Sequence, residues 1–399
     1  MPARFRWRTR TSAIADVTVT QLYNDPYPTY ERLRRNSPVA AAPAVGMWLV
    51  TRWDEVEAVL ADDTVFSSQM LASMVPASLR DNVLLTDGRE HARLRAALQP
   101  SFQPRRARAF AESVVRAVAD DLIDGFVAGG KAELVDDFCA PLAVNVGAQL
   151  LGLDDLPSAD LRRWFQHTAC HFMVEVPSSL RQKAAEINEE IDILLTRRFR
   201  RLAEEADSSL LSSLVCGHGD APGLTEEEAV ANTKVLLFTS MQELRDLIGH
   251  VLLALLSHPE QLAQVNQDAS LLKLAVEEAA RWASPVGVVP RLTTSATELA
   301  GVPIPAGTLL GIAIGSANRD ERRWVDPDAF NLHRKEGMHL AFASGIHFCL
   351  GAWLARAGTE VALQRILERM PNLGLEPGEP PVVRGWTFRG VRRLCATWA

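Results

Sequence analysis

The chain has 399 residues, of which 47% are hydrophobic and 23% charged, so it can bury a large core and has the composition of a globular protein. Its formal net charge of −7 argues against a nucleic-acid-binding protein, because no overall positive excess is available to meet phosphates. Five scattered cysteines without a Cys-x-x-Cys pair predict neither a disulfide framework nor a zinc site, and they fit a reducing cytoplasm.

The N-terminal segment is rich in arginine, but no apolar stretch follows it, so it does not predict a secretory signal. No apolar run reaches the ~20 residues that a membrane span requires, and we expect a cytoplasmic protein that does not enter a membrane. We divide the chain into an arm over residues 1–19 and a single domain over residues 20–399. At the start of this domain the pattern predicts a helix over Tyr30–Arg35, a strand over residues 48–51 and a helix over Trp53–Leu60.

Residues 67–86 lack periodicity and are interpreted as a surface loop over the core. This loop contains Met70 and Met74, and methionine suits an adaptable apolar wall. A helix follows, on which His91 and Arg95 are four residues apart and share one face. Two cationic groups on one face can clamp a pair of carboxylates; a solvated basic face is the alternative.

Residues 110–215 have a strongly helical pattern with a break at Pro177, and residues 217–223 predict a linker. After the linker, Thr225 and Glu228 form a capping box at the start of a long helix. This helix should end near residue 257 and would be ~50 Å long at 1.5 Å per residue. Its middle part is too apolar to face water, so we expect it to cross the interior.

Glu278 and Arg281 are three residues apart on a further predicted helix and can form an ion pair, which contributes little when it lies on a surface. Arg291 precedes an alternating, strand-like segment, and Arg334 follows it further along the chain. The C-terminal part from Trp386 onward predicts short strands with a turn.

The segment Phe342–Arg356 reads as a loop that turns into a helix, with Cys349 at the junction. Gly345 and Gly351 allow sharp bends and close approach to a flat group. The helix N-terminus favours a thiolate, which is a good ligand for a soft metal such as haem iron. His347 is placed to meet an acidic group beside that metal. A buried, inert structural cysteine is the alternative.

This segment resembles the cysteine loop of the cytochrome P450 superfamily through the pattern Phe342-x-x-Gly345-x-His347-x-Cys349-x-Gly351. One departure is Ala343, where that family often has glycine. The order of the other signals is similar to that family from about residue 20 to the end. The resemblance implies a mainly α, multihelical fold with small β-sheets, and a haem b buried between the long central helix and the cysteine-loop helix.

The resemblance also implies roles for individual residues. Cys349 would bind the iron, and the haem propionates would be held by His91, Arg95, Arg291 and His347. A structural cluster behind the cysteine loop would consist of Glu278, Arg281 and Arg334. The loop over residues 67–86 would be a flap and residues 167–183 a lid over the substrate. Pocket candidates are Met70, Met74, Phe238, Val286, Gly287 and Val288.

The central helix departs from the family pattern, which usually has an acidic residue followed by threonine. Gln242 and Glu243 stand at these two positions. One interpretation is drift, with substrate or water supplying the protons. The other is that Glu243 has a raised pKa in an apolar pocket and acts as a general acid–base, with the Thr239 hydroxyl one turn earlier.

Three functions remain open from the sequence. The first is an oxygenase for a small or medium-sized apolar metabolite, supplied with electrons by a ferredoxin and its reductase. A basic cluster of Arg105, Arg106 and Arg108 would then be the ferredoxin docking patch, although a solvated helix end explains it as well. The second is a peroxide-driven oxygenase or atypical haem enzyme that relies on Glu243. The third is a haem-binding sensor without turnover.

Overall fold

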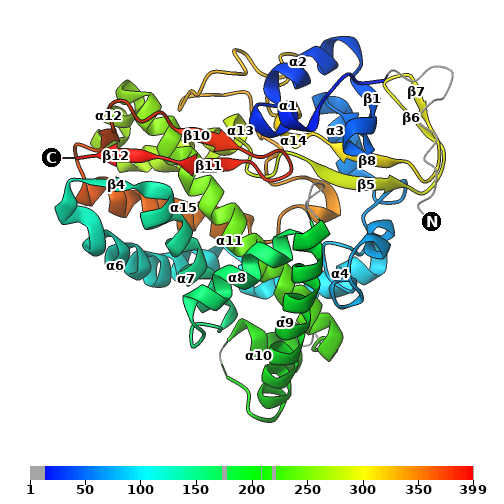
Figure 1. The fold of residues 1–399 in the computed structure, drawn as a ribbon, viewed down its shortest axis with the longest axis horizontal. Helices are drawn as coiled ribbons and strands as arrows, with labels where there is room; N and C mark the ends of the chain where they lie inside the picture. The colour runs from blue at the N-terminus through cyan, green and yellow to red at the C-terminus, as the bar shows by residue number, and fades with distance from the viewer. Residues whose placement is uncertain (1–13, 173–177, 208, 218–221, 399) are drawn as a thin grey trace.

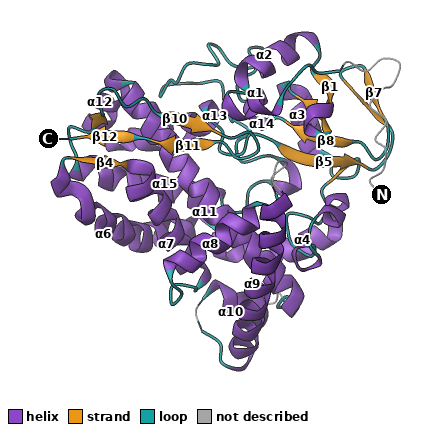
Figure 2. Ribbon diagram, viewed as in Figure 1, coloured by secondary structure: helices purple, strands orange, loops and turns teal. Residues whose placement is uncertain are grey.

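The computed structural model describes residues 14–172, 178–207, 209–217 and 222–398 (Figure 1). Helices make up most of the molecule, and the strands form small sheets in the upper half of the view in Figure 2. The mainly α fold with small β-sheets that the sequence predicts is therefore confirmed.

The first part of the chain forms short helices and one edge of the largest sheet. Its elements are α1 (Val19–Asn24), α2 (Tyr27–Asn36), β1 (Val39–Ala42), η1 (Pro43–Val45), β2 (Met47–Val50), α3 (Trp53–Ala61), β3 (Phe66–Ser67), η2 (Gln69–Met74), η3 (Ala77–Leu79), α4 (Gly88–Leu98) and η4 (Gln99–Phe102). The two helices and the strand predicted at the start of the domain correspond to α2, α3 and β2. Ile14 forms a bridge with Ala41 of β1, so the end of the N-terminal arm already contacts this sheet.

The helical region that the sequence predicts between residues 110 and 215 is confirmed, and its described residues include one short strand. It is preceded by α5 (Pro104–Phe110) and contains η5 (Ala111–Val115), α6 (Arg116–Phe126), η6 (Val127–Gly129), β4 (Lys131–Glu133), η7 (Val135–Cys139), α7 (Ala140–Leu151), α8 (Ser158–Ala169), α9 (Ser178–Glu204) and α10 (Leu210–Cys216). The predicted break at Pro177 and residues 218–221 of the predicted linker lie outside the described residues.

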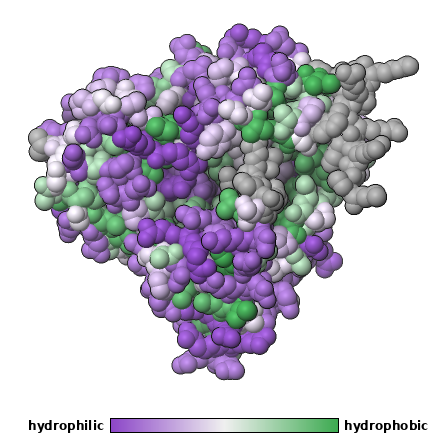
Figure 3. Space-filling view, in the orientation of Figure 1, coloured by the Kyte–Doolittle hydropathy of each residue, from purple (hydrophilic) through white to green (hydrophobic). Residues whose placement is uncertain are grey.

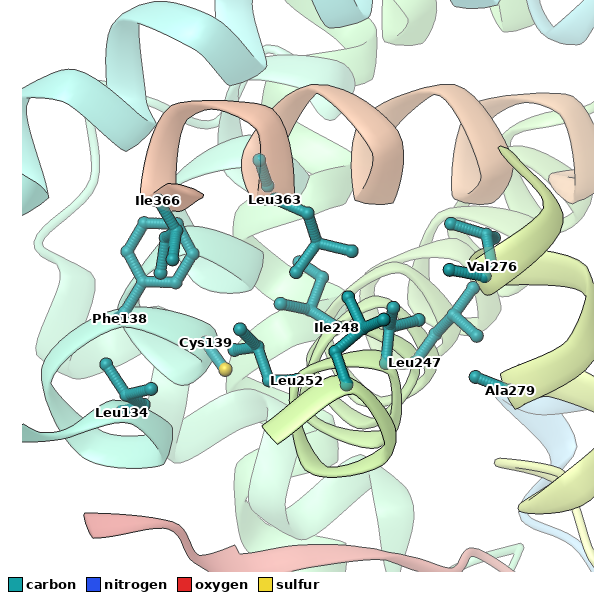
Figure 4. Packing of buried hydrophobic residues seen from close by; sticks show 14 of the residues in the cluster. Leu134, Phe138, Cys139, Leu247, Ile248, Leu252, Val276, Ala279, Leu363 and Ile366 are labelled. Carbon is teal, nitrogen blue, oxygen red and sulfur yellow. The ribbon is translucent and has the colours of Figure 1, made fainter. Parts of the chain in front are cut away.

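The long central helix is α11 (Glu226–Ser257), and its capping box is present. The backbone N–H of Glu228 donates to the Thr225 hydroxyl (3.3 Å), and the Glu228 carboxylate accepts from the backbone N–H of Thr225 (3.0 Å). Figure 4 shows Leu247, Ile248 and Leu252 of this helix packed among buried side chains from the neighbouring helices. This burial explains why the helix crosses the interior, as its apolar middle part predicts.

The C-terminal part surrounds α11 and completes the sheets. Its elements are α12 (Pro259–Gln267), η8 (Ala269–Leu271), α13 (Leu272–Trp282), β5 (Val289–Thr293), β6 (Thr297–Leu299), β7 (Val302–Ile304), β8 (Leu309–Ile312), α14 (Ile314–Ala317), η9 (Gly345–His347), α15 (Ala352–Arg369), β9 (Gly374–Leu375), β10 (Val382–Arg384), β11 (Gly390–Arg393) and β12 (Cys395–Thr397).

The largest sheet has the strand order β1-β2-β8-β5-β3, in which only β2 and β8 are parallel. The smaller sheets are β4-β12-β9 and the pairs β10-β11 and β6-β7. The face of the molecule in Figure 3 is mostly hydrophilic, with scattered hydrophobic residues. Within the described ranges, no helix combines the length and the apolar character needed to cross a membrane.

The predicted structural cluster is buried rather than a surface ion pair. Glu278 accepts from Arg281 with both carboxylate oxygens, at 2.8 Å each, and from Nε of Arg334 at 2.8 Å. The two guanidinium groups also donate to the backbone carbonyls of Asn318, Val325, Asp326, Pro327 and Ala329. One carboxylate therefore joins α13 to the long segment that leads to the cysteine loop.

Replacement of Glu278 by Gln should lower the free energy of unfolding by ~3–5 kcal/mol, because two buried guanidinium groups lose their anion. Denaturant unfolding measures this loss. The control is Glu227→Gln, at an exposed position of α11, which should stay within ~0.5 kcal/mol of the wild type. A loss at Glu278 as small as that of the control would show that the cluster does not stabilise the fold.

Candidate functional site

Cys349 lies at the end of a tight loop, three residues before α15. Its backbone N–H donates to the Phe342 carbonyl (2.9 Å), and its carbonyl accepts from the N–H of Ala352 (3.3 Å). Gly345 has a φ of +69°, and a Cβ atom there would collide with the carbonyl of Leu60 in α3. The loop therefore requires glycine at this position, because its backbone lies directly against α3.

Burial controls the ionisation of the Cys349 thiol in the protein by itself. It raises the pKa of this thiol to about 12, and the negative charge of Glu243 on α11 acts in the same direction. The Gly351 backbone N–H and the cations of Arg95 and Arg356 oppose this effect but do not outweigh it. The effect of the helix N-terminus therefore has the direction that the sequence predicts, but burial outweighs it in the protein alone. A bound metal would displace the thiol proton.

The four predicted propionate ligands converge from three separate segments. His91 is buried on α4, and its ring lies 4.5 Å from that of His347. Arg95, one turn further along α4, donates to the Ile346 carbonyl (3.3 Å). Arg291 is buried on β5 and donates only to the neighbouring Pro290 carbonyl (2.8 Å) within the described part of the chain.

These groups are short of acceptors. Nε2 of His91 is buried without a hydrogen-bond partner among the described residues. Burial lowers the pKa of His91 to about 4 and that of Arg291 to about 10, because the cationic forms lose water without gaining an adjacent anion. Bound carboxylates would reverse both effects. The donor set thus fits the propionates of a haem.

His347 already has an acidic partner within the protein. Its Nε2 atom lies 3.0 Å from a carboxylate oxygen of Asp87, the residue that precedes α4. Asp87 also accepts from the Ser67 hydroxyl (2.6 Å) and from the Gln69 backbone N–H (2.9 Å). Burial opposes its ionisation, but the hydrogen bonds from His347 and Ser67 hold the pKa of Asp87 at about 2.

A propionate can therefore meet His347 only through Nδ1. Asp87 is a site residue that the sequence reasoning missed, and its only signal is its place before a predicted helix.

Space for a flat group is indicated at Gly351, where an added Cβ would meet no protein atom within 4 Å. Together with the unpartnered donors, this open side of the loop fits a haem against Cys349.

The opposite wall of the site is α11. This helix is buried from Ala229 to Leu256, and the exceptions are Thr239, Ser240, Glu243 and Arg245, which are half-buried. Burial raises the pKa of Glu243 to about 7, and the nearby Asp246 carboxylate adds to this rise. No hydrogen bond to the Glu243 carboxyl comes from the described residues, so this group is free to exchange a proton.

The other two predicted catalytic residues are engaged within α11 itself. The Thr239 hydroxyl donates to the Val235 carbonyl (3.0 Å), as a threonine inside a helix commonly does. The side-chain amide of Gln242 donates to Asp246, one turn further along the helix. Of the three predicted catalytic residues, Glu243 is thus the one without a hydrogen-bond partner in the described structure, and its charge acts on the Cys349 thiol.

Phe238 belongs to a buried aromatic cluster near this wall. Its ring stacks on Phe172 (centroids 5.2 Å apart) and on Phe165 (6.2 Å), and Phe388 meets its edge at 5.0 Å. Val286 forms a bridge with Phe388 and packs against the same cluster. Phe165, Phe172 and Phe388 were not predicted, because no local spacing indicates that they meet.

The remaining pocket candidates differ in their exposure and surroundings. Met70 and Met74 are 41% and 63% exposed, whereas Leu71 of the same segment is buried. Gly287 is needed for backbone packing, because a Cβ atom there would collide with the carbonyl oxygen of Trp386. Val288 is buried in the core beside the large sheet. The assignment of the two methionines to the pocket stays a prediction.

The family model described as Cytochrome P450 matches residues 154–371 of this chain. The chain is 34% identical to "Cytochrome P450 monooxygenase PikC" of Streptomyces venezuelae, over 94% of this chain and 91% of the relative. It is 32% identical to "6-deoxyerythronolide B hydroxylase" of Saccharopolyspora erythraea, over 96% and 98%. Among solved structures, P450BioI in complex with an acyl carrier protein superposes with a TM-score of 0.88 at 26% identity, covering 95% of this chain and 100% of that chain.

Replacement of Cys349 by Ser should abolish the thiolate-type absorption spectrum of the reduced, carbon-monoxide-bound protein, because serine cannot supply a thiolate ligand. Cys139→Ser is the control, since Cys139 is a free cysteine buried in the hydrophobic core. Its spectrum should be unchanged. Persistence of the thiolate spectrum in Cys349→Ser would assign the ligand to another cysteine.

Replacement of both Arg95 and Arg291 by Ala should produce mostly haem-free protein, because each charge-assisted hydrogen bond to a propionate contributes ~1.5–3 kcal/mol. The haem content on purification and the rate of haem transfer to a scavenger protein measure the effect. Arg105 and Arg106 are exposed on α5, and their double Ala variant is the control. Full occupancy with an unchanged transfer rate would contradict the assigned role.

Proposed function

This chain belongs to the cytochrome P450 family and is a monooxygenase-type oxidoreductase, and we propose that it oxidises a small or medium-sized apolar metabolite with O₂ and electrons from a ferredoxin and its reductase. The haem would be haem b. The family relationship excludes the non-catalytic sensor that the sequence leaves open. The balanced reaction is R–H + O₂ + 2 e⁻ + 2 H⁺ → R–OH + H₂O.

The observation that carries this proposal is the pair of walls around the site. Cys349 supplies a sulfur ligand on one side, and Glu243 lies close enough on the other side to influence the Cys349 pKa. When bound between them, haem supplies oxygen activation, which a thiolate ligand promotes. The aromatic cluster around Phe238 offers an apolar surface next to the half-buried turn of α11, and an apolar substrate suits such a surface.

Electron delivery would take place from the cysteine side. Helix α5 packs on α15, which begins just after Cys349, and its residues Arg105 and Arg106 are exposed. Arg108 contributes less to this patch, because it forms ion pairs with Glu112 (2.7 Å) and Glu360 (3.0 Å). The two exposed arginines would attract an acidic ferredoxin through long-range electrostatics.

A second candidate function, favoured by Glu243, is oxidation driven by hydrogen peroxide: R–H + H₂O₂ → R–OH + H₂O. The Glu243 carboxylate would take a proton from one peroxide oxygen and return it to the other, so that the O–O bond breaks and water leaves. A carboxyl group with a pKa of about 7 is suited to both steps near neutral pH. The route needs no reductase and no acid–alcohol pair.

Replacement of Glu243 by Gln, which has nearly the same size, should reduce peroxide-driven turnover by roughly 10²-fold, the usual contribution of a general acid–base. In the wild type this turnover should rise with pH through about 7, because the carboxylate form accepts the first proton. The rise should be absent in the Gln variant.

The measurement is product formed per haem from one accepted substrate, with peroxide and separately with ferredoxin and reductase. Glu243→Thr should shift the balance toward reductase-driven turnover, because it restores the hydroxyl of the family pattern. Equal peroxide activity in wild type and Glu243→Gln would exclude the proton-transfer role. Product from the reductase system alone would leave the first candidate function as the remaining one.

A further inference from the structure

Asp246 is a buried carboxyl group within one helical turn of Glu243. Its side chain is completely inaccessible to solvent. One carboxylate oxygen accepts from Nε and Nη2 of Arg245 at 2.9 and 2.7 Å, and the other accepts from the side-chain amide of Gln242. A Cβ atom at Gly390 of β11 would collide with this carboxylate, so the strand behind it leaves room only for glycine.

The carboxyl groups of Glu243 and Asp246 differ in the number of hydrogen bonds that they accept. Residues three apart lie beside each other on a helix, so Glu243 and Asp246 are neighbours. Asp246 has three donated hydrogen bonds, whereas none of the described residues donates to Glu243. When two carboxyl groups share a poorly solvated region, the one with donors takes the negative charge and the other stays protonated.

The other charged and titratable groups near this turn do not change which of the two carboxyl groups carries the negative charge. They are Arg245 on α11, Arg392 on β11, Arg389 in the loop before it, His250 one turn further along α11, Cys139 on η7, and Cys349 with Arg95 and Arg356 on the haem side. His250 is neutral, because burial lowers its pKa to about 3, and burial keeps both cysteines as thiols in the protein alone. Arg245 is two residues from Glu243, so its side chain projects from the opposite face of the helix.

We propose that Asp246 is a positioning residue: held in place by Gln242 and Arg245, it adds charge repulsion to the burial that favours the protonated form of Glu243. Gln242, at the position where the family usually has an acid, then serves to hold Asp246 rather than to deliver protons. The consequence for turnover rests on the proposed role of Glu243, but the charge interaction itself does not.

An infrared titration of the haem-loaded ferric protein tests this inference without turnover. The carbonyl band of a neutral carboxylic acid that disappears with rising pH, and that is missing in Glu243→Gln, belongs to Glu243. In the wild type its midpoint should lie near 7. In Asp246→Asn the midpoint should move to lower pH by roughly one pH unit, because the repelling charge is gone. Exposed Glu227 on the same helix provides the control, and Glu227→Gln should leave the midpoint unchanged.

Asp246→Asn leaves the half-buried Arg245 without its anion, so the double variant Arg245→Gln/Asp246→Asn removes both charges together. It should shift the midpoint in the same direction. An unchanged midpoint in a folded variant that lacks Asp246, or the absence of any Glu243 acid band in the wild type near neutral pH, would overturn the inference.

Peroxide-driven turnover separates this inference from the proposed function. If the Glu243 band shifts in Asp246→Asn but Glu243→Gln retains full peroxide activity, the charge interaction is supported and the peroxide function fails. If Glu243→Gln loses activity but the band does not move in Asp246→Asn, the function is supported and the role of Asp246 fails.

Discussion

The packing of α11 through the middle of the molecule is the constraint on which the rest of the structure depends. Nearly every side chain from Ala229 to Leu256 is buried, against helices that include α7, α13 and α15. A helix buried on all sides cannot rotate or slide without exposing apolar area on one neighbour and overpacking another. The half-buried turn that contains Thr239 and Glu243 is therefore held at one place, opposite the cysteine loop.

The loop is held as firmly from its other side. The guanidinium group of Arg356 lies over the Phe342 ring at 4.2 Å and pairs with Glu277, which also meets His339 (3.3 Å). Burial opposes the ionisation of Glu277, but the hydrogen bonds from His339 and Arg356 hold its pKa at about 2. Ala343 adopts a φ of +58°, which costs an L-residue roughly 1–2 kcal/mol. The packing around the loop therefore maintains a backbone conformation that Ala343 alone would avoid.

Between these two walls the polar groups are unevenly satisfied. Among the described residues, Nε2 of buried His91 has no hydrogen-bond partner, Arg291 donates only to the adjacent Pro290 carbonyl, and the Glu243 carboxyl has no donor. Buried polar groups without partners cost free energy, and a bound ligand is one source of the missing partners. Asp246, by contrast, has all the donors it needs. The two neighbouring carboxyl groups therefore have different environments: that of Asp246 accepts hydrogen bonds, and that of Glu243 can exchange a proton.

The sequence by itself determined the features that depend on neighbouring residues. The capping box of α11, the glycines and cysteine of the loop, and the spacing of Glu278 and Arg281 follow from local pattern, and the order of such patterns indicates the family. Tertiary structure decided which of these residues meet. Asp87 and His347 are 260 positions apart, and the Phe238 cluster joins several separate segments. The same packing turned Gln242 toward Asp246 and left Met70 and Met74 at the surface. Burial and long-range contact set each of these outcomes, and neither is encoded in the spacing of residues along one segment.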